Sequence, residues 1–357
     1  MNVGILGCGT IGGGVLNIID EMPKSQNIKV LKVFDLPFKK EMLGERYAET
    51  IDEVCLNPEI DVVIEAMGGD KLPYECITKA LKNKKSVVTS NKETVSLHME
   101  EFYALAKENG VKFMCEASVG GGIPIICSLI ESVAVNEVDR IYGIINGTTN
   151  FVLTKMDKEG LSMEEALSEA KRLGFAEADA TADIEGLDMT RKICILSSIA
   201  YGGYVPYNEI HHYGISKVTK EILQDLKEKG STLKFVAESR KVGDTVKVSV
   251  EPVVITPNNA LYGVSYEFNA VYYNCSRNDL LGFYGKGAGR YPTATAMVHD
   301  VMRIINGSKP YYFENAKSFK VENFLEDAEY YVYKNGVSSI VKGVKDLGAY
   351  DFVARIL

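Results

Sequence analysis

Short apolar runs alternate with stretches of helical periodicity through the first third of the chain. Residues 3–6 are apolar, glycines follow, and apolar residues then recur at helical spacing, so the pattern predicts a strand, a tight turn and a helix. Alternation of this kind predicts a doubly wound parallel sheet with right-handed crossovers over residues 1–130. The other elements predicted there are strands at 29–34, 61–66, 86–89 and 112–115 and helices at 73–82 and 100–109.

After residue 130 the predicted strands begin to follow one another directly. This order predicts an α+β domain over residues 131–291, in which helices cover an antiparallel sheet. Residues 147–150 and 285–289 are predicted as turns, and a helix at 292–306, with Pro292 near its first position, completes the first domain. The remaining elements of the second domain are strands at 140–145, 231–237, 246–254 and 270–275 and helices at 163–173, 189–200 and 216–229.

A short tail, residues 307–357, follows a cluster of helix-breaking residues. Its pattern predicts a strand at 329–333, a helix at 337–347 and a strand at 352–357. We therefore expect a βαβ-like unit too small to stand alone.

Charge and cysteine content narrow the class of protein. The 48 acidic and 40 basic residues give a net charge of −8, which disfavours nucleic acid and anionic membranes as partners. Seven scattered cysteines indicate neither a disulfide framework nor a thiolate zinc site, and they favour the reducing cytoplasm. We find no apolar stretch long enough to span a bilayer and no signal peptide before the first predicted strand.

The turn after the first strand has the spacing of a dinucleotide-binding motif. Gly7 permits a tight turn, Gly9 lets a pyrophosphate approach the backbone, and Gly12 lets the helix pack on the strand. Asp35, at the end of the next strand, can accept hydrogen bonds from the adenosine ribose. The context favours a Rossmann domain over a turn that binds nothing. The predicted cofactor contacts are Gly7, Gly9, Thr10, Ile11, Gly12 and Asp35.

The residues around Asp35 leave the choice of cofactor open. Asp35 favours NAD because its charge repels a 2′-phosphate. Lys39 and Lys40 favour NADP if their loop folds back, or they belong to a solvated loop. The sequence favours NAD without excluding NADP.

Five carboxylates occur within residues 177–188, a density typical of a solvated loop or of a site. Asp188 and Lys192 are four residues apart, so they share one helix face, and an apolar run begins after Lys192. Either this pair is a surface salt bridge or the lysine is partly buried at a reaction centre.

The chain resembles the homoserine dehydrogenase family from residue 1 to about residue 306. The resemblance is carried by Ser90-Asn91-Lys92, by the glycine-rich turn at 116–124, by Asn146-Gly147-Thr148-Thr149-Asn150, and by the long acidic segment at 174–192. The last segment is the most specific of the four.

This resemblance implies the reversible reduction of L-aspartate 4-semialdehyde to L-homoserine with NAD or NADP, a step toward threonine and methionine. By matching motif positions, Lys92 and Lys192 are the two active-site lysines that converge on the substrate, with Lys192 as proton donor. An ammonium there would stabilise the alkoxide that forms when hydride reaches the aldehyde carbon. The other implied contacts are Asp188 in catalysis, Glu177, Asp183, Gly147 and Thr148 with the substrate, and Lys92 and Gly287 with the cofactor.

The resemblance also implies a monovalent cation, usually sodium, held mainly by backbone carbonyls of the glycine-rich turn. The matching residues are Glu116, Val119, Gly121 and Ile123. Oxygen ligands from one turn suit a hard cation. The alternative is a glycine turn with a structural role alone.

Many family members end in a regulatory ACT domain, whereas about fifty residues remain here, half of such a unit. Because half a unit leaves an open sheet edge, we expect the tails of two subunits to pair in a homodimer. Two other functions remain open: a related dehydrogenase acting on another small amino-acid substrate such as aspartate, and a non-catalytic protein that senses NAD(P).

Overall fold

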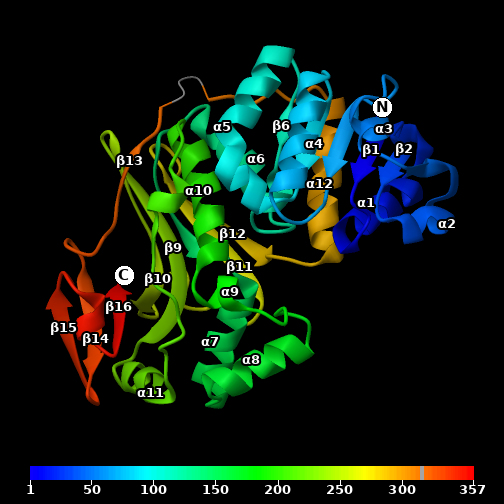
Figure 1. The fold of residues 1–357 in the computed structure, drawn as a ribbon. Helices are drawn as coiled ribbons and strands as arrows, with labels where there is room; N and C mark the ends of the chain where they lie inside the picture. The colour runs from blue at the N-terminus through cyan, green and yellow to red at the C-terminus, as the bar shows by residue number, and fades with distance from the viewer. Residues whose placement is uncertain (314–316) are drawn as a thin grey trace. The chain divides into compact units, whose positions relative to one another are not determined.

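The computed structural model describes residues 1–313 and 317–357. The chain divides into two compact units, one of residues 1–131 and 288–317 and the other of residues 132–287 and 318–357 (Figure 1). Each unit is built around a sheet of its own.

The sheet of the first unit is parallel, with the strand order β3-β2-β1-β4-β5-β6. This is the order of a Rossmann domain, and it confirms the predicted doubly wound sheet. The short strand β3 was not predicted. The strands are β1 (Asn2–Leu6), β2 (Lys29–Phe34), β3 (Tyr47–Ala48), β4 (Val62–Glu65), β5 (Ser86–Thr89) and β6 (Phe113–Met114).

Helices pack on this sheet to form its core. Helix α12 follows residues 132–287 of the second unit along the chain but belongs to the first unit, where it packs against α1 (Figure 1). The sequence predicts this for residues 292–306. Apolar residues of both helices, such as Val15 and Met297, share one core with Ile5 of β1. The helices are α1 (Thr10–Glu21), α2 (Lys40–Leu43), α3 (Asp52–Cys55), α4 (Lys71–Lys82), α5 (Lys92–Asn109), α6 (Ile125–Val133) and α12 (Arg290–Ile305).

The second unit has a mixed sheet with the main order β12-β11-β7-β9-β10-β16-β14-β15. Its central strands β11, β7, β9 and β10 pair antiparallel, as predicted for an α+β domain. The strands are β7 (Val138–Ile144), β8 (His211–His212), β9 (Thr232–Val242), β10 (Thr245–Ile255), β11 (Phe268–Cys275), β12 (Asp279–Lys286), β13 (Lys320–Glu322), β14 (Glu329–Lys334), β15 (Val337–Lys342) and β16 (Phe352–Ile356).

Three helices of this unit, α7, α10 and α11, pack against β9 and so cover one face of the sheet. The turn predicted at residues 147–150 is wrong, because these residues form the first turn of α7. Asn146 begins that helix by accepting a hydrogen bond from the Thr149 N–H at 2.8 Å. The helices are α7 (Gly147–Glu159), α8 (Met163–Arg172), α9 (Thr181–Ile184), α10 (Leu187–Tyr201) and α11 (Lys220–Glu228).

The predicted βαβ-like tail is also wrong. Residues 337–342 form strand β15, which pairs antiparallel with β14 across the two-residue turn Asn335-Gly336. Both turn residues have positive φ, 51° and 78°, as a tight hairpin requires. The tail is not half of a separate unit either, since β16 pairs parallel with β10 and extends the sheet of the second unit.

A buried charge cluster fixes this last strand in place. Arg355 of β16 donates to Glu251 Oε1 at 2.6 Å and to Glu238 Oε2 at 2.8 Å, and all three side chains are almost fully buried. Burial alone would raise the pKa of Glu238, but Arg355 and Arg140 hold it at about 2. Glu238 is therefore charged at neutral pH, and Arg355 is the partner that it shares with Glu251.

We expect Arg355→Met to destabilise the protein by about 3–5 kcal/mol at pH 7, because it leaves two buried carboxylates without their main partner. The loss should be smaller near pH 4, because Glu238, without Arg355 to lower its pKa, can take up a proton there. Urea denaturation at both pH values measures it. Lys342→Met, on the exposed strand β15 of the same tail, is the matched control and should change stability by less than about 0.5 kcal/mol.

Candidate active site

The glycine turn between β1 and α1 has the shape of a dinucleotide-binding turn. Gly7 has φ +86°, and a Cβ at Gly12 would overlap the Gly7 carbonyl oxygen, so only glycine allows α1 to begin so close to β1. At Gly9 no described atom lies within 4 Å of an ideal Cβ, which leaves the backbone open to a ligand. The cofactor contacts of Thr10 and Ile11, the first residues of α1, remain predictions.

Asp35 lies directly after β2 and accepts a hydrogen bond from the Cys8 N–H in the glycine turn. Lys39 folds back over both residues: its Nζ lies 3.4 Å from Asp35 Oδ2 and donates to the Cys8 carbonyl oxygen. Lys40 instead pairs with Glu49. Of the two lysines that the sequence connects with NADP, only Lys39 therefore lies beside Asp35.

A second acidic residue near this turn, Glu65, was not identified from the sequence. Glu65 ends β4, next to Leu6 at the end of β1, and it is fully buried. The Thr89 hydroxyl donates to its carboxylate at 2.5 Å and the Met67 N–H at 2.7 Å. Burial nevertheless raises the pKa of Glu65 to about 7. A lone carboxylate at the end of an apolar run was the signal that could have identified it.

Lys92 is the first residue of α5 in the first unit. Asn91 fixes this helix start: its Oδ1 accepts hydrogen bonds from the N–H groups of Glu93 and Thr94, at 3.1 and 3.2 Å. Its Nδ2 donates to the Gly69 carbonyl oxygen at 2.7 Å. The Asn-Lys motif thus sets the position of Lys92 through the cap that precedes it.

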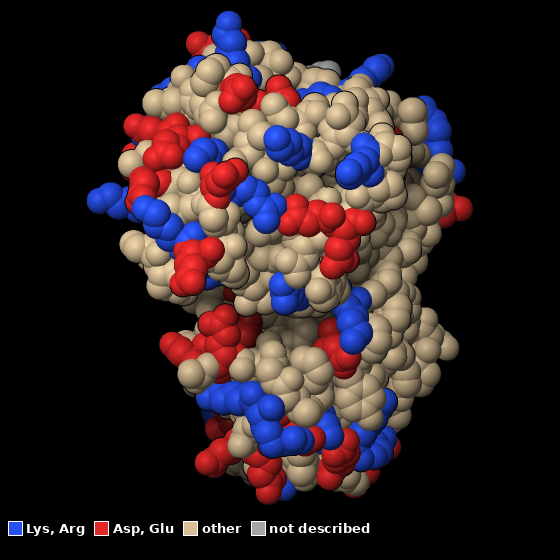
Figure 2. All heavy atoms as spheres, turned by 90° about the vertical axis from the view of Figure 1, so that its right-hand side faces the viewer, with Lys and Arg blue, Asp and Glu red and all other residues tan. Residues whose placement is uncertain are grey.

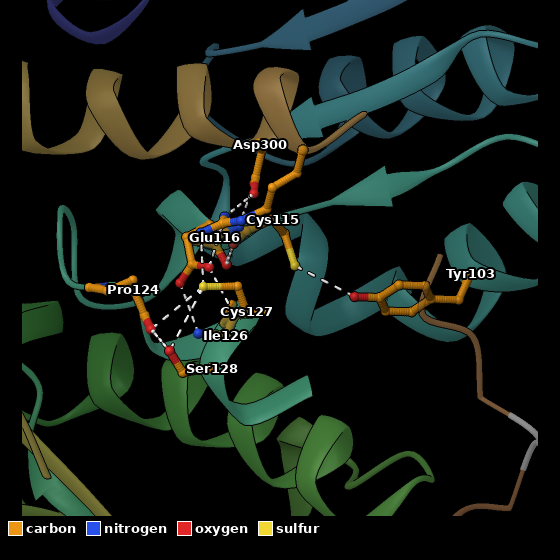
Figure 3. A network of polar contacts seen from close by, with 10 residues as sticks. Tyr103, Cys115, Glu116, Pro124, Ile126, Cys127, Ser128 and Asp300 are labelled. Atoms are coloured by element: carbon orange, nitrogen blue, oxygen red, sulfur yellow. Dashed lines mark hydrogen bonds and ion pairs between the residues drawn. The ribbon is translucent and has the colours of Figure 1, made fainter. Parts of the chain in front are cut away.

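Glu116 lies at the centre of a polar network that organises the glycine-rich turn (Figure 3). Its carboxylate accepts hydrogen bonds of 2.8 Å from the N–H groups of Ile126 and Cys127, at the start of α6. Its own N–H donates to Asp300 of α12 at 2.9 Å. Arg303, one turn after Asp300, bonds both carboxylates, at 2.8 and 3.3 Å. The turn is therefore fastened to α6 and α12.

The backbone of this turn fits the expected cation. Gly120 and Gly121 have φ of +73° and +56°, so the chain curls through two left-handed residues. The carboxylate of Glu116 is engaged with α6, so carbonyl oxygens are what the turn offers. Within the described residues, no group of three or more His, Cys, Asp or Glu side chains forms a metal site. Any cation at this turn would therefore be held by backbone carbonyl oxygens.

Lys192 and Asp188 lie one turn apart on α10, and both are buried, with exposures of 8% and 5%. Lys192 Nζ lies 2.7 Å from Asp188 Oδ2 and donates a second hydrogen bond, also 2.7 Å, to the Ile145 carbonyl oxygen. Because leaving an ammonium buried and unpaired is costly, these two contacts compensate the burial of Lys192. The burial excludes the surface salt bridge considered from the sequence.

Asn146 joins the parts of this site and was missed as a site residue. Its Nδ2 donates to Asp183 Oδ1 at 2.7 Å and to Asp188 Oδ2 at 2.8 Å, while its Oδ1 accepts from the Thr149 N–H. The helix cap of α7 and the carboxylates of α9 and α10 are therefore one network. An asparagine directly before a helical pattern was the available signal.

The remaining substrate candidates lie around this network. Gly147 and Thr148 form the first turn of α7, and the Thr148 hydroxyl donates to the Phe175 carbonyl oxygen at 2.5 Å, so α7 is tied to the acidic loop. Glu177 is exposed on that loop, and no described contact joins it to the network. Gly287 follows β12, and its backbone packs against the Asn269 side chain.

The outer surface adds little to these sites. Basic and acidic side chains are interspersed over the face in Figure 2, a pattern that exerts no strong field of one sign on approaching ligands. Among the described residues, no helix combines the length and apolar character that crossing a membrane requires.

The first unit has a parallel sheet whose first turn suits a pyrophosphate, and the second unit has a buried, hydrogen-bonded lysine. Together these features are typical of the nicotinamide-dependent oxidoreductases. Comparison with known proteins identifies the family within this class. Residues 7–116 match the NAD-binding domain of homoserine dehydrogenase, and residues 124–302 match the homoserine dehydrogenase domain itself.

Curated relatives carry the same name. The chain is 39% identical to a homoserine dehydrogenase of Bacillus subtilis, over 89% of this chain and 78% of that protein. It is 36% identical to one of Pseudomonas aeruginosa, over 85% of this chain and 72% of that protein.

Solved structures agree. A homoserine dehydrogenase from Thiobacillus denitrificans superposes with a TM-score of 0.90 and 29% identity, covering 100% of this chain and 98% of that one. A hyperthermophilic archaeal homoserine dehydrogenase in complex with NADPH gives a TM-score of 0.74 and 27% identity, covering 87% of this chain and 98% of that one. The chain belongs to the homoserine dehydrogenase family and is an NAD(P)-dependent oxidoreductase acting on a CH–OH group.

Proposed function

We propose that the chain interconverts L-homoserine and L-aspartate 4-semialdehyde with Lys192 as the proton donor. The observation that carries this assignment is the buried ammonium of Lys192, held by Asp188 and by the Ile145 carbonyl oxygen at 2.7 Å each. An ammonium has three N–H donors, so these two bonds leave one for the substrate. Lys92 is the second active-site lysine by its match to the family motif.

The chemistry follows from this arrangement. When bound, a reduced nicotinamide supplies hydride to the aldehyde carbon, and the carbonyl oxygen becomes an alkoxide. Lys192 stabilises that charge and transfers one proton to it, which gives the hydroxyl group of homoserine. In the opposite direction the neutral amine of Lys192 accepts the hydroxyl proton. Asp188 holds Lys192 in place, while Asp183 and Glu177 bind the α-ammonium of the substrate.

We expect Lys192→Ala to lower kcat by at least about 10²-fold, because the alkoxide loses both its proton donor and its charge partner. Cofactor affinity, measured by fluorescence titration of NADH or NADPH, should stay within about twofold. Arg191→Ala, the adjacent basic residue on α10, is the matched control and should retain activity. Normal turnover by a correctly folded Lys192→Ala variant would remove Lys192 from the role of proton donor.

For the cofactor, we propose a preference for NAD with residual acceptance of NADP. Asp35 is placed to bind the ribose hydroxyls, since it lies at the end of β2 against the glycine turn. Lys39, 3.4 Å from Asp35 Oδ2, partly neutralises this carboxylate and offers a cation to a 2′-phosphate.

We expect Asp35→Ala to lower kcat/KM with NAD by about tenfold, the loss of one charged hydrogen bond worth about 1.4 kcal/mol. Lys39→Ala should lower kcat/KM mainly with NADP. Lys40→Ala, whose ammonium pairs with Glu49, is the control and should change neither. Initial rates with both cofactors measure these ratios, and an unchanged NAD to NADP ratio in both variants would contradict the assignment.

Further proposals concern the setting of the enzyme. The carbonyl oxygens of Glu116, Val119, Gly121 and Ile123 would hold a monovalent cation, probed first with sodium, which would brace the glycine-rich turn. The seven cysteines are free thiols, which supports a cytoplasmic location. The reaction places the enzyme on the route to threonine and methionine.

We also propose a homodimer that forms through the tail. Strand β15 is an edge of its sheet, and its Val337 and Ile340 are 69% and 66% exposed. An open edge with exposed apolar residues favours pairing with a second chain. Ile340→Lys should shift sedimentation velocity profiles toward monomer, whereas the exposed-surface control Leu56→Lys, in the first unit, should not. Equal profiles for both variants would rule out pairing through this edge.

A further inference from the structure

Asn269 is a buried carboxamide that the fold alone does not explain. It lies at the second position of β11 and is 0% exposed. Neither its Oδ1 nor its Nδ2 has a hydrogen-bond partner within the described residues. Buried amides almost always find partners, so a fully unpartnered one indicates a site that a ligand completes.

Two glycines of the second unit enclose this side chain. A Cβ at Gly287 would overlap the Asn269 carboxamide, and a Cβ at Gly147 would lie 3.7 Å from Asn269 Oδ1. A Cβ at Gly147 would also lie 2.8 Å from the Glu267 carbonyl oxygen, so glycine is required there. The carboxamide thus lies against the backbone of the residue that begins α7.

The start of α7 is the positive end of a thirteen-residue helix. The N–H groups of its first residues have no partner within the helix, as at every helix start, and Asn146 caps that of Thr149. The Asn146 side chain also donates hydrogen bonds to the carboxylates of Asp183 and Asp188. The N–H donors at the helix start and the two acids are therefore both next to Asn146.

We propose that Asn269 anchors the α-carboxylate of the amino-acid substrate, together with the first N–H groups of α7 at Gly147 and Thr148. The inference rests on the proposed function. With no bond to hold either atom, the carboxamide can turn its NH₂ group toward the helix start at no cost in hydrogen bonds. A zwitterionic substrate then has its carboxylate among donors and its ammonium among the acids.

A ligand role and a structural role predict opposite effects of an apolar replacement. Leucine has nearly the same shape as asparagine and buries no polar atom. Asn269→Leu should therefore keep or raise the melting temperature without ligands, because it removes two unpartnered polar atoms. The same variant should raise KM for homoserine about tenfold or more, while KM for the dinucleotide changes less than about twofold.

Two truncated homoserine analogues, used as competitors of homoserine, identify the end of the substrate that Asn269 holds. 4-Hydroxybutyrate keeps the carboxylate and hydroxyl group of homoserine, and 3-aminopropan-1-ol keeps the amine and hydroxyl group. In Asn269→Leu the inhibition constant of the acid should rise by the same factor as KM for homoserine, and that of the amine should not change. Asn269→Asp should weaken the acid further by charge repulsion, and it keeps the test possible if the leucine variant fails to fold.

Asn274→Leu makes the same change five residues further along β11 and should leave all these constants unaltered. An unchanged KM for homoserine in Asn269→Leu would overturn the proposal, and so would equal weakening of both inhibitors. Activity of the unaltered enzyme toward homoserine tests the proposed function separately, so the two can fail independently.

Discussion

A single buried ammonium group, that of Lys192, determines how the second unit is assembled. To compensate this cation away from water, α10 brings Asp188 to it, and Ile145, directly after β7, directs its carbonyl oxygen at it. Asn146 donates a second hydrogen bond to the same oxygen, Asp188 Oδ2. Gly186 lets α10 start in contact with the sheet, since a Cβ there would lie 3.0 Å from the Phe235 ring. The ammonium of Lys192 is thus held both by a neighbour on its own helix, Asp188, and by the backbone of a residue distant in sequence, Ile145.

The strand β9 connects this centre with the tail. Successive side chains of a strand point to opposite faces, and Glu238 and Ser239 are consecutive. Glu238 binds Arg355 of the tail, whereas the Ser239 hydroxyl bonds with Ser197 and Tyr201 of α10, at 2.7 and 2.8 Å. The Arg355 side chain of the last strand and the helix that carries Lys192 therefore contact opposite faces of β9, so the tail and α10 are joined through one strand of the sheet.

Sequence patterns predicted the elements whose signals are local. Apolar runs predicted most strands of both sheets, though not β3, β8, β12, β13 and β15, and the glycine turn with Asp35 predicted the cofactor domain. The prediction for the tail was wrong because the apolar spacing after residue 336 is also compatible with a helix. The dipeptide Asn335-Gly336, which is typical of a hairpin turn, is the signal that favours the observed strands. Residues whose role depends on distant partners could not be identified locally: Arg355 meets β9 and β10, and Asn269 meets Gly147 and Gly287, only after folding.

Glu65 has a consequence for how the enzyme takes up its cofactor. Its pKa of about 7 means that this carboxyl is partly ionised in neutral solution, beside the turn where a pyrophosphate would bind. A dinucleotide phosphate bound at this turn would favour the protonated carboxyl, and uptake of a proton would then accompany its binding.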